Sequence, residues 1–219
     1  DNDDKIVVEG AQAFRLDIDH GDYPMCTSSN CSTSGALCGG ALPPNASIEV
    51  IGIDKAYNSR VGNGPFPTKQ SGSDGDVIRE LGHEYGTTTK RPRDCGWYDC
   101  CISNSAKHIL GVNYLCINHL DTIGLIGKEL GYIKICTSYS YQGKIIDYYP
   151  DDITLTGEIP TPIYEVLSGG WEIDSSCKSY DELPELAKKF IEIVEKHSHI
   201  PVKFLGTGPA NDDLIVRDI

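Results

Sequence analysis

The chain has 219 residues with 39% hydrophobic side chains, a composition typical of a globular protein that can bury a substantial core as one folded unit. It holds no apolar run long enough to span a bilayer, which argues against an integral membrane protein. The formal net charge of -13 at pH 7 argues against nucleic acid or an anionic membrane surface as the main partner.

The first third of the chain is predicted to hold two short strands. Residues 6–8 are an apolar run suited to an interior strand, and residues 11–16 follow as one or two helical turns. The N-terminus is acidic and shows no secretory pattern, so a cytoplasmic location is expected. The second strand is predicted over residues 48–53. It leads to a Gly- and Pro-rich loop over residues 60–68, which is either a place where backbone approaches a ligand or an ordinary connector.

Two helices and a strand are predicted in the middle of the chain. The first helix covers residues 74–85, where apolar residues recur at helical spacing, and Gly86 ends it. The second helix covers residues 97–110. The strand over residues 112–117 follows and delivers a polar motif to its C-terminal end.

The last third is predicted to contain a hairpin, a helix and a strand. Alternating apolar and polar residues predict an antiparallel hairpin over residues 132–141 and 144–149. The other predicted elements are an extended segment over residues 160–171, a helix over residues 181–197 and a strand over residues 202–205. The alternation of helices and strands predicts an α/β fold with a mixed, largely parallel sheet flanked by helices and an additional antiparallel hairpin region. No linker divides residues 1–219, so one domain is expected.

A basic, hydroxyl-rich loop stands out in this acidic chain. Lys90, Arg91 and Arg93 follow three threonines at residues 87–89. Hydroxyl groups and planar guanidinium groups suit a carboxylate or a phosphate. In an extended segment Arg91 and Arg93 face the same side, where two guanidinium groups repel each other unless an anion lies between them. The loop is therefore predicted to be an anion pocket, and a solvated surface loop is an equally open alternative.

Two other polar places suit a purine nucleotide. The Gln12 amide suits a purine edge, and the hydroxyl groups of residues 27–29 suit a phosphate. Asp121 follows the strand predicted over residues 112–117, and ligands of open α/β sheets gather beyond the carboxyl ends of strands. A carboxylate there can accept both the ring N–H and the exocyclic amine of guanine, which adenine cannot match. Ordinary polar turns are the alternative at both places.

Taken together, these motifs resemble adenylosuccinate synthetase over nearly the whole chain. Residues 88–93 read Thr-Thr-Lys-Arg-Pro-Arg and lead into Gly-Trp, where the family has Thr-Thr-Gly-Arg-x-Arg-Arg before its own Gly-Trp. Asn-His-Leu-Asp at residues 118–121 stands where the family has Thr-Lys-Leu-Asp. Gly-Thr-Gly-Pro at residues 206–209 stands where it has Ser-Thr-Gly-Pro. Three more strings follow the family in order: Glu-Gly-Ala-Gln at 9–12, Asp-Ile-Asp-His-Gly at 17–21 and Thr-Ser-Ser-Asn at 27–30.

The resemblance implies three sets of binding residues and assigns neither a catalytic residue nor a metal ligand to this chain. The implied IMP contacts are Gln12, Thr27, Val61, Gly62 and Arg91. The implied L-aspartate contacts are Thr87, Thr88, Thr89, Lys90 and Arg91. The implied GTP contacts are Arg93, His119, Leu120, Asp121, Gly206, Thr207 and Gly208.

The resemblance also implies an activity, that of a GTP-dependent ligase that joins IMP to L-aspartate in AMP synthesis and uses Mg²⁺. The matched motifs are those of the C-terminal part of the family. The phosphate loop, the general base, the general acid and the magnesium ligand of the family belong to its N-terminal part. The resemblance therefore implies that the isolated chain is not a competent catalyst, and that the full-length enzyme is a homodimer.

Departures from the family pattern leave alternatives open. Lys90 replaces a glycine, Asp94 an arginine, His119 a lysine and Ala13 a glycine. Lys90 is expected to change the backbone if the glycine uses a positive φ, and Asp94 is expected to compete for Arg91 or Arg93. One alternative is a non-catalytic purine-nucleotide-binding or interaction module. Weaker alternatives are a hydrolase metal site from Asp17, Asp19 and His20, and a zinc site from His20, Cys26, Cys31 and Cys38, whose spacing fits zinc modules poorly.

Overall fold

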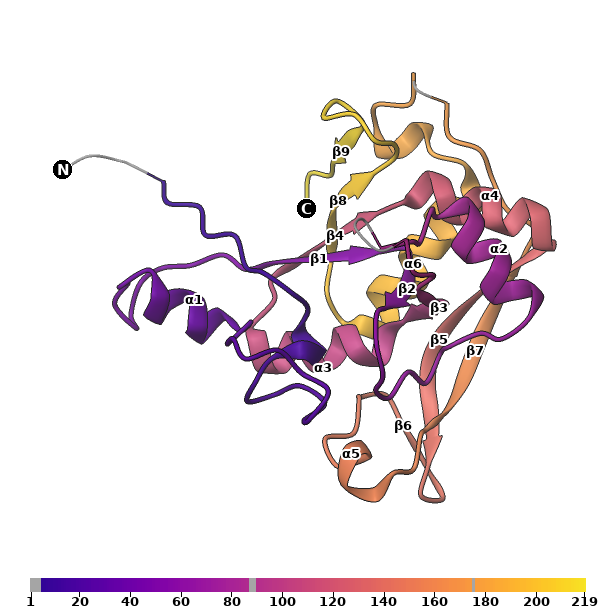
Figure 1. Cartoon of the computed structure of the whole chain (residues 1–219). Coiled ribbons are helices and arrows are strands. Elements are labelled where there is room, and N and C mark those ends of the chain that lie inside the picture. The colour runs from indigo at the N-terminus through magenta and orange to yellow at the C-terminus, as the bar shows by residue number, and fades with distance from the viewer. Residues whose placement is uncertain (1–4, 87–89, 175) are drawn as a thin grey trace.

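The computed structural model describes residues 5–86, 90–174 and 176–219, and its strands form two sheets (Figure 1). The first sheet has the order β1 (Ile51–Lys55), β4 (Tyr114–Asn118), β8 (Val202–Gly206) and β9 (Leu214–Val216). β1, β4 and β8 run parallel, and β9 returns antiparallel to β8. The carboxyl ends of the three parallel strands therefore lie at one edge.

The second sheet contains β2 (Tyr57–Arg60), β3 (Asp94–Asp99), β5 (Tyr132–Tyr141), β6 (Lys144–Ile146) and β7 (Thr161–Ser168). β3 runs parallel to β5, whereas β2, β6 and β7 pair antiparallel with their neighbours. The predicted α/β class with mixed pairing is confirmed, and the strands are shared between two sheets.

Four helices flank the sheets: α2 (Ser73–Leu81), α3 (Cys100–Leu110), α4 (Leu120–Leu130) and α6 (Glu185–Ser198). Phe190 of α6 packs on Tyr98 and Trp171, with ring centroids 5.9 and 6.0 Å apart. Gly124 lets Trp171 approach α4 closely, because a Cβ at this glycine would lie 2.5 Å from the indole. The indole N–H donates to the Leu120 carbonyl at 2.9 Å, which fixes the first turn of α4.

The strand and hairpin predictions with the clearest local signals are confirmed. β4 and β8 lie within two residues of the predicted strands, and β1 overlaps the strand predicted over residues 48–53. β5 and β6 form the predicted hairpin, with Gln142 and Gly143 at φ 48° and 74°. Two consecutive positive φ values at the centre of a two-residue loop are those of a type I′ turn, which matches the twist of the strands.

Two predictions were wrong about the type of element. Residues 6–8 are no strand and are exposed, with Val7 91% accessible, because no described strand pairs with them. The helix predicted from residue 97 begins only at Cys100, since residues 94–99 form β3 against β2 and β5. Asp99 caps α3 by accepting the N–H of Cys101 at 3.1 Å.

Other predictions misplaced helix ends or missed short elements. α2 ends at Leu81 rather than at residue 85, because His83 adopts the left-handed φ of 51°. α6 begins at Glu185, after Pro184, and Ser179 caps a separate short turn, η2 (Tyr180–Glu182). The elements that were not predicted are α1 (Thr33–Gly39), α4, α5 (Ile153–Thr156), η2, β2, β3 and β9.

The N-terminal segment extends to one side of the sheets and lies near α3 (Figure 1). The helical turns predicted over residues 11–16 reduce to one short turn, η1 (Phe14–Leu16). The Thr33 hydroxyl donates to the Leu110 carbonyl at 2.6 Å, which ties α1 to the end of α3. Within the described residues, every helix is too short or too polar to cross a bilayer.

Candidate functional site

The carboxyl edge of the parallel strands brings together most of the residues predicted to bind GTP. Lys55 at the end of β1 lies in register with Asn118 at the end of β4. Gly206, which ends β8, packs on Asn118 so closely that a Cβ would lie 2.5 Å from its side-chain oxygen. Residues 119–121 and 206–208 therefore follow neighbouring strands of the same sheet. Edges of this kind bind ligands in open α/β folds.

His119 opens the turn that leads into α4. Its φ of 61° is left-handed, and its ring lies edge-on to Tyr57 with centroids 5.5 Å apart. Nδ1 lies 3.3 Å from the Thr122 hydroxyl, and Asp121 follows in the first turn of the helix. Burial lowers the pKa of His119, with a further contribution from the charge of Lys55, whereas the charges of Asp121 and Glu84 act in the opposite direction. The net shift favours the neutral imidazole, a ring that can stack, where the family has a lysine.

Glu84 forms a buried charge cluster beside His119, and its side chain is only 1% exposed. Oε1 accepts hydrogen bonds from Lys55 Nζ at 2.5 Å and from the Tyr57 hydroxyl at 2.9 Å. Oε2 accepts one from Arg93 Nη1 at 3.0 Å. Burial raises the pKa of Glu84, but the hydrogen bond and charge of Lys55 outweigh it, with help from Tyr57 and Arg93, so the pKa is below its usual value.

This cluster links Arg93 to His119 through Glu84 and Tyr57. Lys55, Tyr57 and Glu84 were not predicted to belong to the site. Glu84 is separated by only two residues from the threonines of the basic loop, and this proximity was the one available signal in the sequence.

The basic loop is closed by backbone hydrogen bonds at its base. Gly86 N–H donates to the Arg91 carbonyl at 2.8 Å, and Lys90 N–H donates to the Gly86 carbonyl at 2.9 Å. Lys90 keeps a positive φ of 53°, so the backbone expected for a glycine is present despite the side chain. Arg91 is exposed, whereas Arg93 turns inward to Glu84. The predicted aspartate contacts at residues 87–89 lie outside the described residues.

The prediction that Asp94 pairs with Arg91 or Arg93 was wrong. Asp94 forms an ion pair with Lys69 at 2.7 Å instead of with Arg91 or Arg93. Arg93 is therefore engaged by Glu84 alone among the described carboxylates.

Two of the predicted IMP contacts lie in one small network of the N-terminal segment. The Ser29 hydroxyl donates to the Gln12 amide oxygen at 3.3 Å and lies 3.4 Å from the Thr27 hydroxyl. Gln12 holds a left-handed φ of 61°. The recorded hydrogen bonds of the described residues do not join this network to Arg91, Arg93 or Asp121. The shared IMP-binding role implied for Gln12 and Arg91 therefore stays a prediction.

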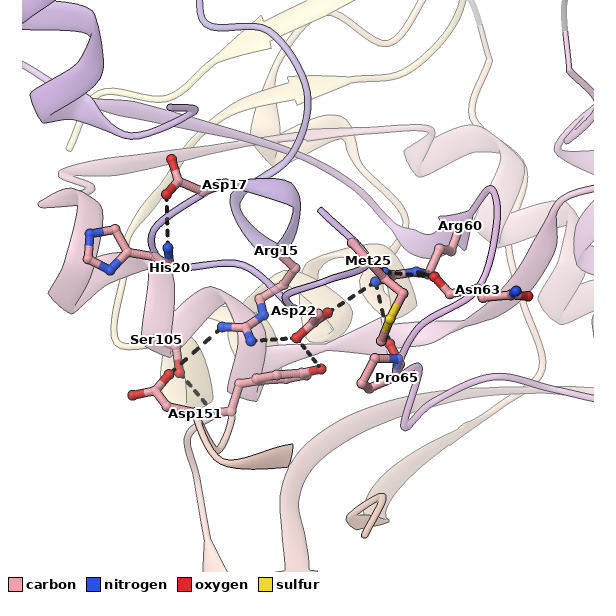
Figure 2. Close-up of polar contacts among 11 residues, drawn as sticks. Arg15, Asp17, His20, Asp22, Met25, Arg60, Asn63, Pro65, Ser105 and Asp151 are labelled. Atoms are coloured by element: carbon pink, nitrogen blue, oxygen red, sulfur yellow. Dashed lines mark hydrogen bonds and ion pairs between the residues drawn. The ribbon is translucent and has the colours of Figure 1, made fainter. Parts of the chain in front are cut away.

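Asp17 stabilises the loop formed by residues 17–31 of the N-terminal segment. Its carboxylate accepts the backbone N–H groups of Asp19, His20 and Cys31 at 2.8, 2.9 and 2.5 Å. These bonds give Asp17 a structural role, which weakens the hydrolase alternative. Figure 2 shows the His20 ring pointing away from Arg15.

A second buried carboxylate, Asp22, connects this segment to the loop after β2 (Figure 2). It accepts Arg15 Nη2 at 2.6 Å and Arg60 Nη1 at 3.2 Å. Arg60 immediately precedes Val61 and Gly62, the other predicted IMP contacts, which are exposed at the start of the loop.

The candidate zinc ligands His20, Cys26, Cys31 and Cys38 form no compact group. In the described part of the chain, the one set of three potential ligand atoms within 4.8 Å of one another belongs to Asp99, Cys101 and Cys136. All three residues are buried, and Asp99 already accepts the Tyr139 hydroxyl at 2.5 Å and the Cys101 N–H. Cys101 and Cys136 pack in the smaller hydrophobic cluster with Tyr149 and Ile153, so the group has a structural role.

Comparison with known proteins identifies similar sequences and a similar structure. The family model of adenylosuccinate synthetase matches residues 1–215. The adenylosuccinate synthetase of Caldicellulosiruptor bescii is 43% identical over 215 residues, which cover 98% of this chain and 49% of that protein. That of Komagataella phaffii is 42% identical over 216 residues, which cover 98% and 49%.

The structure of fully ligated adenylosuccinate synthetase from Plasmodium falciparum has a TM-score of 0.85 to this chain at 38% identity. The match covers 96% of this chain and 49% of that one. The chain therefore spans about half the length of the curated relatives it matches.

Proposed function

This chain belongs to the adenylosuccinate synthetase family, and on that premise we propose that it supplies the IMP-, aspartate- and guanine-binding elements of a GTP-dependent ligase that joins IMP to L-aspartate. In this reaction GTP phosphorylates the 6-oxygen of IMP, and the aspartate amine then displaces the phosphate. Negative charge builds on the transferring phosphoryl oxygens, so positioned cations and N–H donors contribute most of the rate enhancement.

The observation that carries the proposal is the meeting of residues 119–121 and 206–208 at one edge of a parallel sheet. Arg93 reaches this edge through Glu84 and Tyr57, so a cation from the basic loop lies on the guanine side. In this arrangement Asp121 accepts the two N–H groups of guanine, His119 stacks on the base, and residues 206–208 flank it.

The IMP and aspartate contacts follow the family by position. Arg91 is exposed and carries a guanidinium that can bind the aspartate carboxylates or IMP in two-pronged fashion. Gln12 and Thr27 supply the purine and phosphate contacts, and Val61 and Gly62 lie against the ribose. The threonines at residues 87–89, with Lys90, complete the aspartate site.

Mg²⁺ is implied by the family, but the described residues at this edge do not fit a magnesium site. The Glu84 carboxylate is taken by Lys55 and Arg93, and Asp121 is assigned to guanine. We therefore assign no magnesium ligand to these residues. The chain alone is expected to form no adenylosuccinate from IMP, GTP, aspartate and Mg²⁺, and clear turnover would refute this expectation. The full-length enzyme is expected to be a cytoplasmic homodimer.

Nucleotide titration of the chain tests the proposal. Since adenine leaves the Asp121 carboxylate unpaired, GTP should bind about 100-fold more tightly than ATP. Asp121→Asn should lose this preference and gain affinity for xanthosine triphosphate, because an amide donates one hydrogen bond and accepts one, as the xanthine edge requires. Equal affinity of the unsubstituted chain for GTP and ATP would favour the alternative, a non-catalytic nucleotide-binding or interaction module.

A further inference from the structure

The predicted IMP contacts come from two segments that share no strand pairing. Thr27 belongs to the irregular N-terminal segment, whereas Val61 and Gly62 begin the loop after β2. A ligand held by both segments needs them at a fixed separation, because hydrogen bonds weaken outside a narrow range of distances and angles. Hydrogen bonds of the Asp22 and Arg60 side chains connect the N-terminal segment to the loop after β2.

Asp22 is a buried hub, with a side chain that is fully inaccessible. Oδ1 accepts Arg15 Nη2 at 2.6 Å and the Tyr149 hydroxyl at 3.1 Å, and Oδ2 accepts Arg60 Nη1 at 3.2 Å. Figure 2 shows the carboxylate between the two guanidinium groups. The Asp22 carboxylate thus binds Arg15 of the N-terminal segment and Arg60 at the end of β2.

Arg60 in turn shapes the loop that follows it. Nη2 donates to the Met25 carbonyl at 3.2 Å and to the Asn63 carbonyl at 3.1 Å. Gly64 has a φ of 136°, and a Cβ at this position would lie 2.1 Å from Arg60 Nη2. The loop therefore wraps around the guanidinium, which fastens it to Met25, two residues before Thr27.

Arg15 is buried, and Asp22 is its main counter-charge. Its side chain is 9% exposed and lies over the Tyr149 ring, with the guanidinium carbon 3.9 Å from the ring centroid. Its Nε and Nη1 are buried without a hydrogen-bond partner among the described residues. Asp151 lies 3.9 Å away and is 83% exposed, so it compensates the charge weakly. Without Asp22, the guanidinium groups of Arg15 and Arg60 would lose the counter-charge that they share.

We propose that Asp22 is a positioning residue of the IMP subsite, acting through Arg60 to hold Val61 and Gly62 at a fixed place relative to Thr27. The inference rests on the proposed function, because it names the ligand as a purine nucleoside monophosphate. It predicts that loss of the Asp22–Arg60 bond weakens IMP binding and leaves GTP binding at the sheet edge unchanged.

The test measures IMP and GTP affinities of the full chain and of Arg60→Lys by calorimetric titration. This variant keeps the charge and the Asp22–Arg15 pair, so the fold is retained, but one ammonium cannot bind Asp22, Met25 and Asn63 in the same geometry. We expect IMP affinity to fall about tenfold or more, with GTP affinity within about twofold of the original. Asp22→Asn should show the same split, and the double variant should lose no more than the worse single one.

Glu195→Gln is the matched control. It removes a partly buried carboxylate that pairs with Arg217 at 2.6 Å near the start of β8, away from the carboxyl edge, and should change neither affinity. Unchanged IMP affinity in Arg60→Lys, or an equal fall for IMP and GTP, would overturn the role of Asp22. Failure of the unsubstituted chain to bind IMP would instead overturn the proposed function.

Discussion

Two buried carboxylates, Glu84 and Asp22, organise two regions of the molecule in different ways. Each is 1% exposed, lies between two cations and accepts a tyrosine hydroxyl. The partners of Glu84 come from β1, β2 and the residue that precedes β3, which strand pairing already holds in place. The arginine partners of Asp22 bring together an irregular segment and the end of β2.

The exposure of the partner cations differs as well. The side chains of Lys55 and Arg93 are 33% and 29% exposed, whereas those of Arg15 and Arg60 are 9% and 14% exposed. A cation that can reach water loses less when its counter-charge is removed. We therefore expect the Glu84 cluster to add little to an arrangement that strand pairing already fixes. The Asp22 cluster should itself fix how the N-terminal segment and the end of β2 are arranged.

The largest expected effect is on stability. Asp22→Ala removes the shared counter-charge of the Arg15 and Arg60 guanidinium groups, and we expect it to lower the free energy of unfolding by about 3–5 kcal/mol. Glu84→Ala should cost less, about 1–3 kcal/mol, because its partners can be hydrated. Urea denaturation of both variants measures the difference. A larger loss for Glu84→Ala would contradict the comparison.

The second prediction concerns ligand selectivity and reverses the one made for Arg60. Glu84→Gln should weaken GTP binding about tenfold, because the amide keeps one acceptor oxygen where Glu84 has two and so cannot hold Arg93 together with Lys55 and Tyr57 beside His119. IMP affinity should stay within about twofold of the original. Arg60→Lys should thus weaken IMP binding alone, and Glu84→Gln should weaken GTP binding alone. Equal losses of IMP and GTP affinity in Glu84→Gln would indicate general destabilisation and contradict the separation of the two regions.

The third prediction is a pH dependence at Glu84. The folded-state pKa of this group lies below its usual value of 4.5, so its stabilising contribution is complete above that pH and is lost as pH falls through the folded-state pKa. The difference in unfolding free energy between the unsubstituted chain and Glu84→Gln should be constant from pH 7 down to that value and shrink at lower pH. A difference that grows on acidification would have the wrong sign.

The smallest expected effect is at Lys90, which lies in the loop anchored by Arg93. A non-glycine residue at φ 53° is strained by about 1 kcal/mol, so Lys90→Gly should stabilise the chain by up to about that amount. Lys90→Ala keeps the Cβ and should give no such gain. Thermal denaturation of both variants separates backbone strain from loss of the charge.

The two regions also differ in how far the sequence predicts them. β4, β8 and the β5–β6 hairpin follow from local apolar patterns and turn residues, so Asp121 and residues 206–208 could be placed at strand ends in advance. The strand predicted at residues 6–8 was wrong because pairing depends on a partner that the local pattern does not specify.

The two hubs could not be predicted for a similar reason. Glu84 follows the end of α2, where a carboxylate is usually solvated, and its partners lie 29, 27 and 9 residues away. Asp22 meets Arg60 and Tyr149 across 38 and 127 residues. No periodicity connects such positions, so burial of a charge cluster becomes visible only in three dimensions.

The structure of the chain in complex with GTP tests the central claim most directly. We expect the guanine ring at the carboxyl edge of β1, β4 and β8, with its two N–H donors within hydrogen-bond distance of the Asp121 carboxylate and its face against His119. A guanine ring bound elsewhere, with Asp121 turned to solvent, would contradict the proposed site.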